Sequence, residues 1–112
     1  VTGIYSDSWT GPVASYTRWD CPAGRLLVSV ASQPVLFTVP QTVVALSDGH
    51  EVARVKVSPG SERTMLLPRR RERGRCSIQL RVTPTAVPSL VYGGPDTREL
   101  GVRVTALEDR PS

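Results

Sequence analysis

The stretch that decides the fold is Cys76-Ser-Ile-Gln-Leu-Arg-Val82. Apolar and polar residues alternate along it, so that one set would face a core and the other water: Cys76, Ile78, Leu80 and Val82 against Ser77, Gln79 and Arg81. Such period-two alternation is typical of a strand with one buried face. The stretch is therefore predicted to be a strand of an antiparallel sheet.

The same alternation recurs on both sides of this strand. It is found over residues 25–31, 52–57 and 100–106, where Val104 and Ala106 are expected on one face. The last strand is predicted over 99–107 and a frayed tail over 108–112. Turns rich in Gly and Pro separate these segments, and the segment before residue 24 is expected to be a loop. No run of ten or more residues free of Pro and Gly has a helical period, so the pattern predicts seven or eight short strands in a β-sandwich or small barrel.

The length of 112 residues supports one domain, 1–112, with a single modest core. It excludes a two-domain enzyme and an α/β barrel. No apolar run approaches the roughly 18 residues that a membrane helix needs. We expect this domain to be a piece of a larger membrane or envelope protein.

The net charge of +4 is concentrated in Arg69-Arg-Arg-Glu-Arg-Gly-Arg75, whose five Arg and one Glu account for all of it. One interpretation is a solvated hairpin loop. The other is contact with phosphates, either of an anionic membrane surface or of a polyanionic polymer, made by Arg69, Arg70, Arg71, Arg73 and Arg75. Nucleic acid is not an expected partner, because no aromatic residues interleave with these arginines to stack on bases.

The two cysteines, Cys21 and Cys76, lie outside any metal-binding spacing, so no metal site is predicted from them. In a small, Pro-rich chain such a pair predicts one disulfide and an oxidising compartment. Two buried free thiols are the alternative.

Catalysis is not expected. The one histidine, His50, follows the Asp48-Gly49 hairpin turn, which is a poor place for a base held between a nucleophile and a carboxylate. Loop carboxylates could form a glycosidase pair, but a sandwich of this size leaves little room for a deep cleft. We expect no cofactor. A structural calcium ion bound by Asp7, Asp96 and backbone carbonyls of the neighbouring loops is the alternative, and no DxDxDG string supports it.

Four of the six aromatic residues lie in the first 19 positions: Tyr5, Trp9, Tyr16 and Trp19. Aromatic rings among small polar residues suit carbohydrate binding, in which a ring stacks on the apolar face of a sugar. The alternative is that these rings fill the core of the sandwich. Exposure separates the two interpretations, because an exposed row of rings favours sugar and buried rings favour a structural role.

Two motifs resemble a known kind of domain. The opening Gly3-Ile-Tyr-Ser-Asp-Ser-Trp-Thr-Gly11, followed by Tyr16, and the closing Gly93-Gly-Pro-Asp-Thr-Arg-Glu-Leu-Gly-Val102 resemble small jelly-roll, carbohydrate-binding-module-like domains of bacterial glycosyltransferases. In actinobacteria such domains look like the extracytoplasmic C-terminal part of polytopic cell-wall glycosyl- and arabinosyltransferases. The resemblance implies a jelly-roll-like sandwich in which the Asp and Arg side chains brace neighbouring loops. Ser8 departs from the pattern, because a glycine often precedes the Trp.

These observations together predict a non-catalytic carbohydrate-binding or accessory module of a cell-envelope glycosyltransferase, on the extracytoplasmic side. Its expected partners are a cell-wall polysaccharide and the rest of a parent membrane protein. The candidate stacking residues are Trp9, Tyr16 and Trp19, and the candidate hydroxyl-binding residues are Asp7, Arg18, Asp96 and Arg98. The alternative is a structural domain that packs on a neighbouring membrane or periplasmic domain through its aromatic residues.

Overall fold

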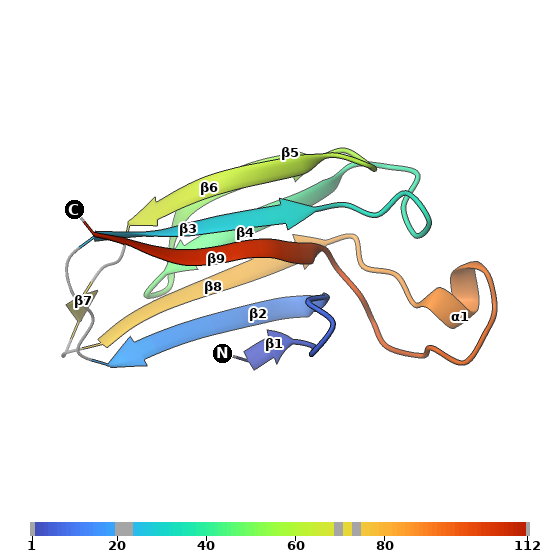
Figure 1. The fold of residues 1–112 in the computed structure, drawn as a ribbon, viewed down its shortest axis with the longest axis horizontal. Helices are drawn as coiled ribbons and strands as arrows, with labels where there is room; N and C mark the ends of the chain where they lie inside the picture. The colour runs from blue at the N-terminus through green and yellow to red at the C-terminus, as the bar shows by residue number, and fades with distance from the viewer. Residues whose placement is uncertain (1, 20–23, 69–70, 73–74, 112) are drawn as a thin grey trace.

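The computed structural model describes residues 2–19, 24–68, 71–72 and 75–111. Two antiparallel sheets face each other across one main core, so the predicted all-β sandwich is confirmed (Figure 1). The described elements, in chain order, are β1 (Thr2–Ile4), β2 (Thr10–Trp19), β3 (Gly24–Ala31), β4 (Gln41–Ser47), β5 (His50–Val57), β6 (Glu62–Pro68), β7 (Arg71–Glu72), β8 (Arg75–Thr83), α1 (Pro88–Val91) and β9 (Arg103–Pro111).

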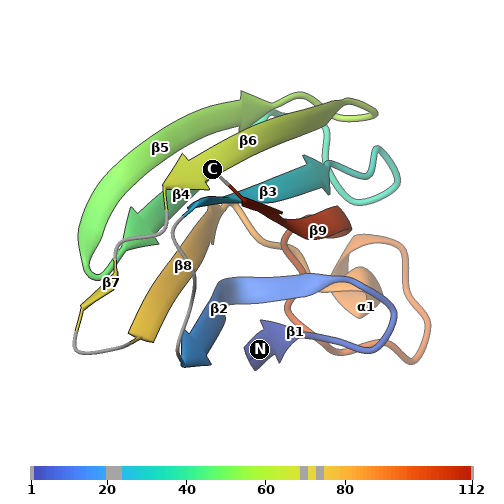
Figure 2. The ribbon, with the colours of Figure 1, turned by 60° about the vertical axis from the view of Figure 1, so that its left-hand side comes forward.

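The two sheets differ in width. The first has the strand order β1-β2-β8-β4-β5, with the two-residue β7 paired to β8, and the second has the order β6-β3-β9. Eight of the described strands have three or more residues, in agreement with the prediction. The chain passes between the sheets from β2 to β3, from β3 to β4, from β5 to β6, from β6 to β7 and from β8 to β9. This path wraps it around the core as in a jelly roll (Figure 2).

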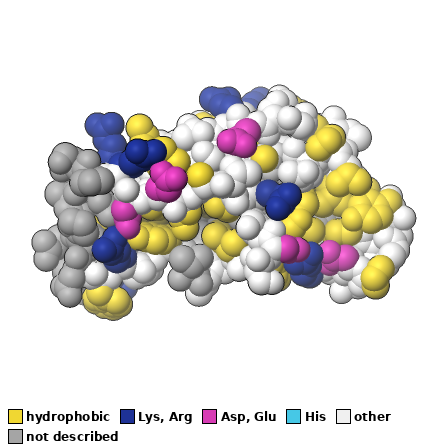
Figure 3. Space-filling view, in the orientation of Figure 1, with side chains coloured by type: hydrophobic (Ala, Val, Ile, Leu, Met, Phe, Trp, Pro, Cys, Tyr) yellow, Lys and Arg dark blue, Asp and Glu magenta, His cyan; other side chains and the backbone are white. Residues whose placement is uncertain are grey.

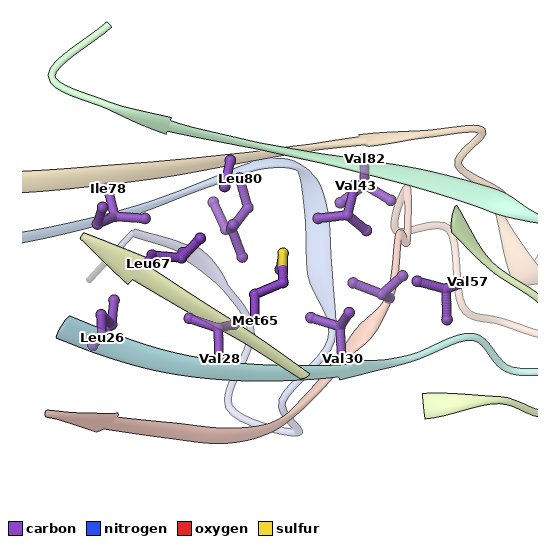
Figure 4. Packing of buried hydrophobic residues seen from close by; sticks show 13 residues of the cluster. Leu26, Val28, Val30, Val43, Val57, Met65, Leu67, Ile78, Leu80 and Val82 are labelled. Carbon is purple, nitrogen blue, oxygen red and sulfur yellow. The ribbon is translucent and has the colours of Figure 1, made fainter. Parts of the chain in front are cut away.

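The predicted strand at 76–82 is β8, which lies between β2 and β4 near the middle of the first sheet. Its four predicted inward residues, Cys76, Ile78, Leu80 and Val82, are all buried. In the second sheet, β3 turns Leu26, Val28 and Val30 toward them, and these side chains interdigitate in the core (Figure 4). Alternation therefore places the core residues of both central strands correctly.

The last strand differs from its prediction. It begins at Arg103 and runs to Pro111, so the expected tail is a strand paired with β3. The register shifts between Ser29 and Val30, which leaves Val104 opposite Val30 but Ala106 opposite Ser29. Ala106 therefore lies on the outer face, and Leu107 takes its place on the core face with Val104. A bulge breaks the period of two, and the sequence pattern alone does not show it.

The N-terminal segment also differs from its prediction. Thr10–Trp19 is a strand, β2, and it is the longest of the described strands rather than a loop. Its register with β8 turns Ala14, Tyr16 and Arg18 toward the space between the sheets. The outward positions include Val13 and Trp19. Apolar Val13 and Trp19 thus point outward and charged Arg18 points inward. The strand therefore lacks the alternation expected of a half-buried strand.

A second, smaller core lies at the end of the sandwich that carries α1 (Figure 1). Leu36 and Phe37, from the β3–β4 connection, pack there on Leu100, with Trp9 and Ala86 at the margin. This small core fixes the long connections next to the strand ends.

Candidate functional site

Arg98 joins the two motifs of the sequence. Its guanidinium donates to both carboxylate oxygens of Asp7, at 3.1 and 2.9 Å, and to both of Asp96, at 3.0 and 2.8 Å. The guanidinium also stacks over the ring of Tyr5, with 4.8 Å from its carbon to the ring centroid. The sequence pointed to these three charged residues as candidates, but it placed Tyr5 only among the N-terminal aromatic residues and did not relate it to Arg98. The proximity of Tyr5 to Arg98 arises from the turn that follows β1.

The charges of this cluster are largely satisfied internally. Hydrogen bonds from Arg98 lower the pKa of the Asp7 and Asp96 carboxyls, and the two carboxylates raise the pKa of Arg98. Four of the five guanidinium N–H groups are used in these hydrogen bonds. Nε donates to Asp96, Nη1 donates to Asp7, and Nη2 donates to both carboxylates. The cluster can therefore brace two loops, as the resemblance implied. A calcium ion at Asp7 and Asp96, the alternative to no cofactor, would have to compete with this guanidinium.

Trp9 is half-buried and packs against the smaller core with Leu36, Phe37 and Leu100. Tyr16 is also half-buried and packs against the main core. Its hydroxyl donates to Asp109 at 3.3 Å, and Arg18 donates to the other oxygen of the same carboxylate. Asp109 lies in the segment expected to be a tail, so this contact between β2 and β9 could not be expected from the sequence.

Trp19 has a different environment from the other candidate rings. It ends β2 with 68% of its surface exposed, at the end of the molecule opposite α1 (Figure 1). The guanidinium carbon of Arg75, the residue directly opposite on β8, lies 6.0 Å from the centroid of its ring. The outward face of the same strand pair continues with Thr17 beside Ser77. The described residues thus place one aromatic ring, and no row of rings, on this face.

Hydrophobic side chains are exposed at the other end of the molecule. In and after α1, Leu90 is 83% exposed and Tyr92 61% exposed, and Val91 is exposed between them. Val35 and Val39, of the β3–β4 connection, are exposed as well. Hydrophobic side chains gather in the space-filling view at the end that carries these segments (Figure 3). The apolar run Leu90-Val-Tyr92 was the sequence signal for this surface, but the sequence does not show whether these side chains are buried or exposed.

A groove runs beside β9. It has a volume of about 290 Å³, and its lining is free of charged residues: Ile4, Ser8, Val104, Thr105, Ala106 and Leu107. The groove adjoins a small cavity between the sheets. This cavity has a volume of about 20 Å³ and is lined mainly by core residues such as Leu26, Ile78 and Leu80. The groove therefore opens along the edge of the second sheet.

Several predicted residues lie wholly or partly outside the described residues. The structure does not describe Arg69, Arg70 and Arg73 of the predicted anionic-surface contact, nor the side chain of Arg71. Cys21 lies outside the described residues as well. Cys76 is buried and is not a free thiol, and the predicted pairing of the two cysteines stays a prediction.

No protein-family model matches the chain, and no curated protein is significantly similar to it. Within the described ranges, no helix has the length and hydropathy of a membrane span. The same ranges contain no group of three or more His, Cys, Asp or Glu side chains that could hold a metal ion.

Proposed function

We propose that the chain is a non-catalytic carbohydrate-binding module, and that a glycan binds on the outer face of β2 and β8 beside Trp19. The observation that carries this proposal is the 68% exposure of the Trp19 ring next to a guanidinium. An indole left in water is available to stack on the apolar face of a sugar ring. Arg75, at 6.0 Å from the ring centroid, offers N–H donors to the hydroxyls of the same sugar.

The polar strip beyond Trp19 would extend such a site. On the outward face, Thr17 lies opposite Ser77, and Ser15 lies opposite Gln79. These side chains are hydroxyls and an amide, which both donate and accept hydrogen bonds. A chain of sugars could follow the strand pair from the ring of Trp19 along these groups. Trp9 and Tyr16 are left out of the proposed site, because both pack against hydrophobic cores.

Titration with soluble arabinan, galactan and mannan fragments, followed by tryptophan fluorescence and calorimetry, tests this proposal. We expect one fragment to change the emission of Trp19 and the Trp19→Ala variant to lose the heat of binding. Tyr92→Ala is the matched control, because it removes an exposed ring at the opposite end and should bind normally. The proposal fails if none of the fragments binds, or if Trp19→Ala binds as well as the unaltered chain.

A second candidate function is a structural interaction domain that packs on a neighbouring domain of a larger protein. The exposure of Leu90, Val91 and Tyr92 favours it, because contiguous exposed apolar side chains mark interaction surfaces. Hydroxyl-radical footprinting would compare the isolated chain with the larger protein in its membrane preparation. Protection of α1 in the larger protein, with Leu66 on β6 unchanged, would support docking by this end. Equal labelling of α1 in both samples would exclude it.

A further inference from the structure

The polar strip on the outer face of β2 and β8 leads from Trp19 to a second arginine. Trp19 lies opposite Arg75 at one end of the strip. Six positions further along both strands, Val13 lies opposite Arg81. Because a strand rises about 3.4 Å per residue, Arg81 lies about 20 Å along the strip from the exposed ring. An extended chain of several sugars that begins on Trp19 can therefore reach Arg81.

The guanidinium of Arg81 is exposed and oriented, but its charge is not neutralised. Its Nε donates to Oε1 of Gln79, the preceding outward residue of the same strand, at 2.9 Å. This hydrogen bond uses one of the five N–H groups of the guanidinium. In the described part of the chain, no carboxylate forms an ion pair with Arg81. Its two terminal nitrogens are therefore available to a ligand.

Basic residues outnumber acidic ones on this face of the first sheet. The described outward positions of β2, β8, β4 and β5 carry one acidic residue, Glu51, and four basic ones: Arg54, Lys56, Arg75 and Arg81. Arg54 donates to the Glu51 carboxylate at 2.7 Å and so occupies it. The charge on this face therefore favours an anionic ligand over a neutral one.

Arg81 is better placed than Arg75 to bind an anion. The backbone of Glu72, on β7, lies opposite that of Arg75 in the register of the hairpin. The residues opposite Arg81 are Val13 on β2 and Val44 on β4, and neither carries a charge that competes for the guanidinium. Apolar neighbours also lower the local dielectric constant, which strengthens a charge-assisted hydrogen bond.

We propose that the glycan of this site is acidic, and that Arg81 binds a carboxylate on one of its sugars. The inference rests on the proposed function, because it extends the same strip from Trp19. The paired donors of a guanidinium match the two oxygens of a carboxylate. The hydroxyls and the amide between the two ends would bind the sugar hydroxyls. A single-stranded nucleic acid fits less well, because the described residues place one aromatic ring on this face and successive bases need several.

Paired acidic and neutral oligosaccharides test the proposal. The probes are oligogalacturonate and oligomannuronate, each compared by calorimetry with its own methyl ester, which has the same chain but no charge. We expect at least one acid to bind about tenfold more tightly than its ester, the equivalent of one hydrogen-bonded ion pair. The proposal is overturned if neither acid binds more tightly than its ester.

Variants assign the preference to one residue. Arg81→Gln should weaken binding of the acid by about tenfold, to the affinity of the ester, and leave the ester unchanged. Arg25→Gln is the matched control, because it removes the same charge from an exposed position on the outer face of the second sheet. Equal losses in the two variants would mean that the overall charge of the chain, and not Arg81, selects the acid, and would overturn the proposal.

Two further measurements separate this inference from its alternatives. Binding of the esters that requires Trp19 but shows no preference for the acids overturns the inference and leaves the proposed function standing. A preference that requires Arg81 but survives Trp19→Ala supports the anion site and contradicts the proposed stacking. Sedimentation with phosphatidylglycerol vesicles, if it is lost in Arg81→Gln, would assign the anion to a membrane surface and overturn the inference.

Discussion

Arg98 and Asp7, 91 positions apart in the sequence, form a bidentate ion pair with N···O distances of 3.1 and 2.9 Å. Around it the opening and closing motifs meet along their length. Trp9 packs near Leu100 in the smaller core, and Gly101 N donates to Thr10 O at 2.8 Å. The two motifs therefore form one joint, which fixes the N-terminal turn against the connection that leads to β9.

Replacing Arg98 with Lys should weaken this joint. An ammonium group cannot face two carboxylates with paired donors while stacking on the Tyr5 ring. We expect Arg98→Lys to lower Tm at least twice as much as Arg54→Lys, which changes an exposed pair with Glu51 at 2.7 Å. Calorimetry of the two variants measures the difference. Equal changes in Tm would show that the joint adds no more than an ordinary surface ion pair.

Stability should fall in acid because of the same joint. Hydrogen bonds from Arg98 lower the pKa of Asp7 and Asp96 below the ordinary value of 3.8. Each carboxyl then binds fewer protons folded than unfolded, so its contribution is complete above about pH 4 and is lost as the pH falls through the folded pKa. Tm should therefore decline below about pH 4. The Asp7→Asn, Asp96→Asn double variant should decline less steeply, and an identical pH profile would contradict this assignment.

Ser8 offers a stabilising substitution. Its φ is 72°, in the left-handed region, and the turn around it closes with Ser8 N donating to Tyr5 O at 2.9 Å. A side chain in this region is strained, so Ser8→Gly should raise the free energy of unfolding by about 1 kcal/mol, measured in urea. Asp48→Gly is the control. Its φ is 51°, but Asp tolerates this region and should gain less. Destabilisation by Ser8→Gly would show that the serine side chain stabilises the turn.

The sequence predicts most strands because their faces differ in polarity. β8 and β3 each bury one face, so alternation identifies both the strands and their inward residues. β2 escapes prediction because Arg18 points inward, where Asp109 meets it, and Trp19 points outward. The inward residues of β9 are wrong after Val104 because its bulge shifts the alternation. Both errors arise from contacts between residues far apart in the chain.

The candidate site was predictable to a smaller extent. The resemblance implied that Asp7 and Arg98 brace neighbouring loops, and the geometry agrees. It did not indicate which aromatic rings are exposed, because rings in the same short segment lie on different faces and at different depths.

Gly101 lies where the two motifs approach most closely. A Cβ at this position would meet Thr10 Oγ1 at 2.5 Å and Gly11 O at 3.0 Å. Gly101→Ala should therefore push the two motifs apart at this point and lower the free energy of unfolding by about 2 kcal/mol. Gly11→Ala is the matched control, because the nearest atom to its Cβ would be Glu99 O at 3.9 Å. Equal urea midpoints for the two variants would mean that the two motifs can move apart at no cost in stability to accommodate the added Cβ.

Gln41 holds together three connections from a fully buried position. Its Nε2 donates to Pro84 O and Gly101 O, each at 3.0 Å, and its Oε1 accepts from Ser32 Oγ at 2.6 Å. Gln41→Leu keeps a similar volume but leaves these three groups, of which those of Ser32 and Gly101 are buried, without this partner. Since an unsatisfied buried group costs about 1–3 kcal/mol, we expect a loss of about 3 kcal/mol in urea unfolding. Thr42→Leu, at the neighbouring outward position of β4, is the control and should change stability little. A Gln41→Leu variant as stable as this control would mean that water replaces the amide at all three groups.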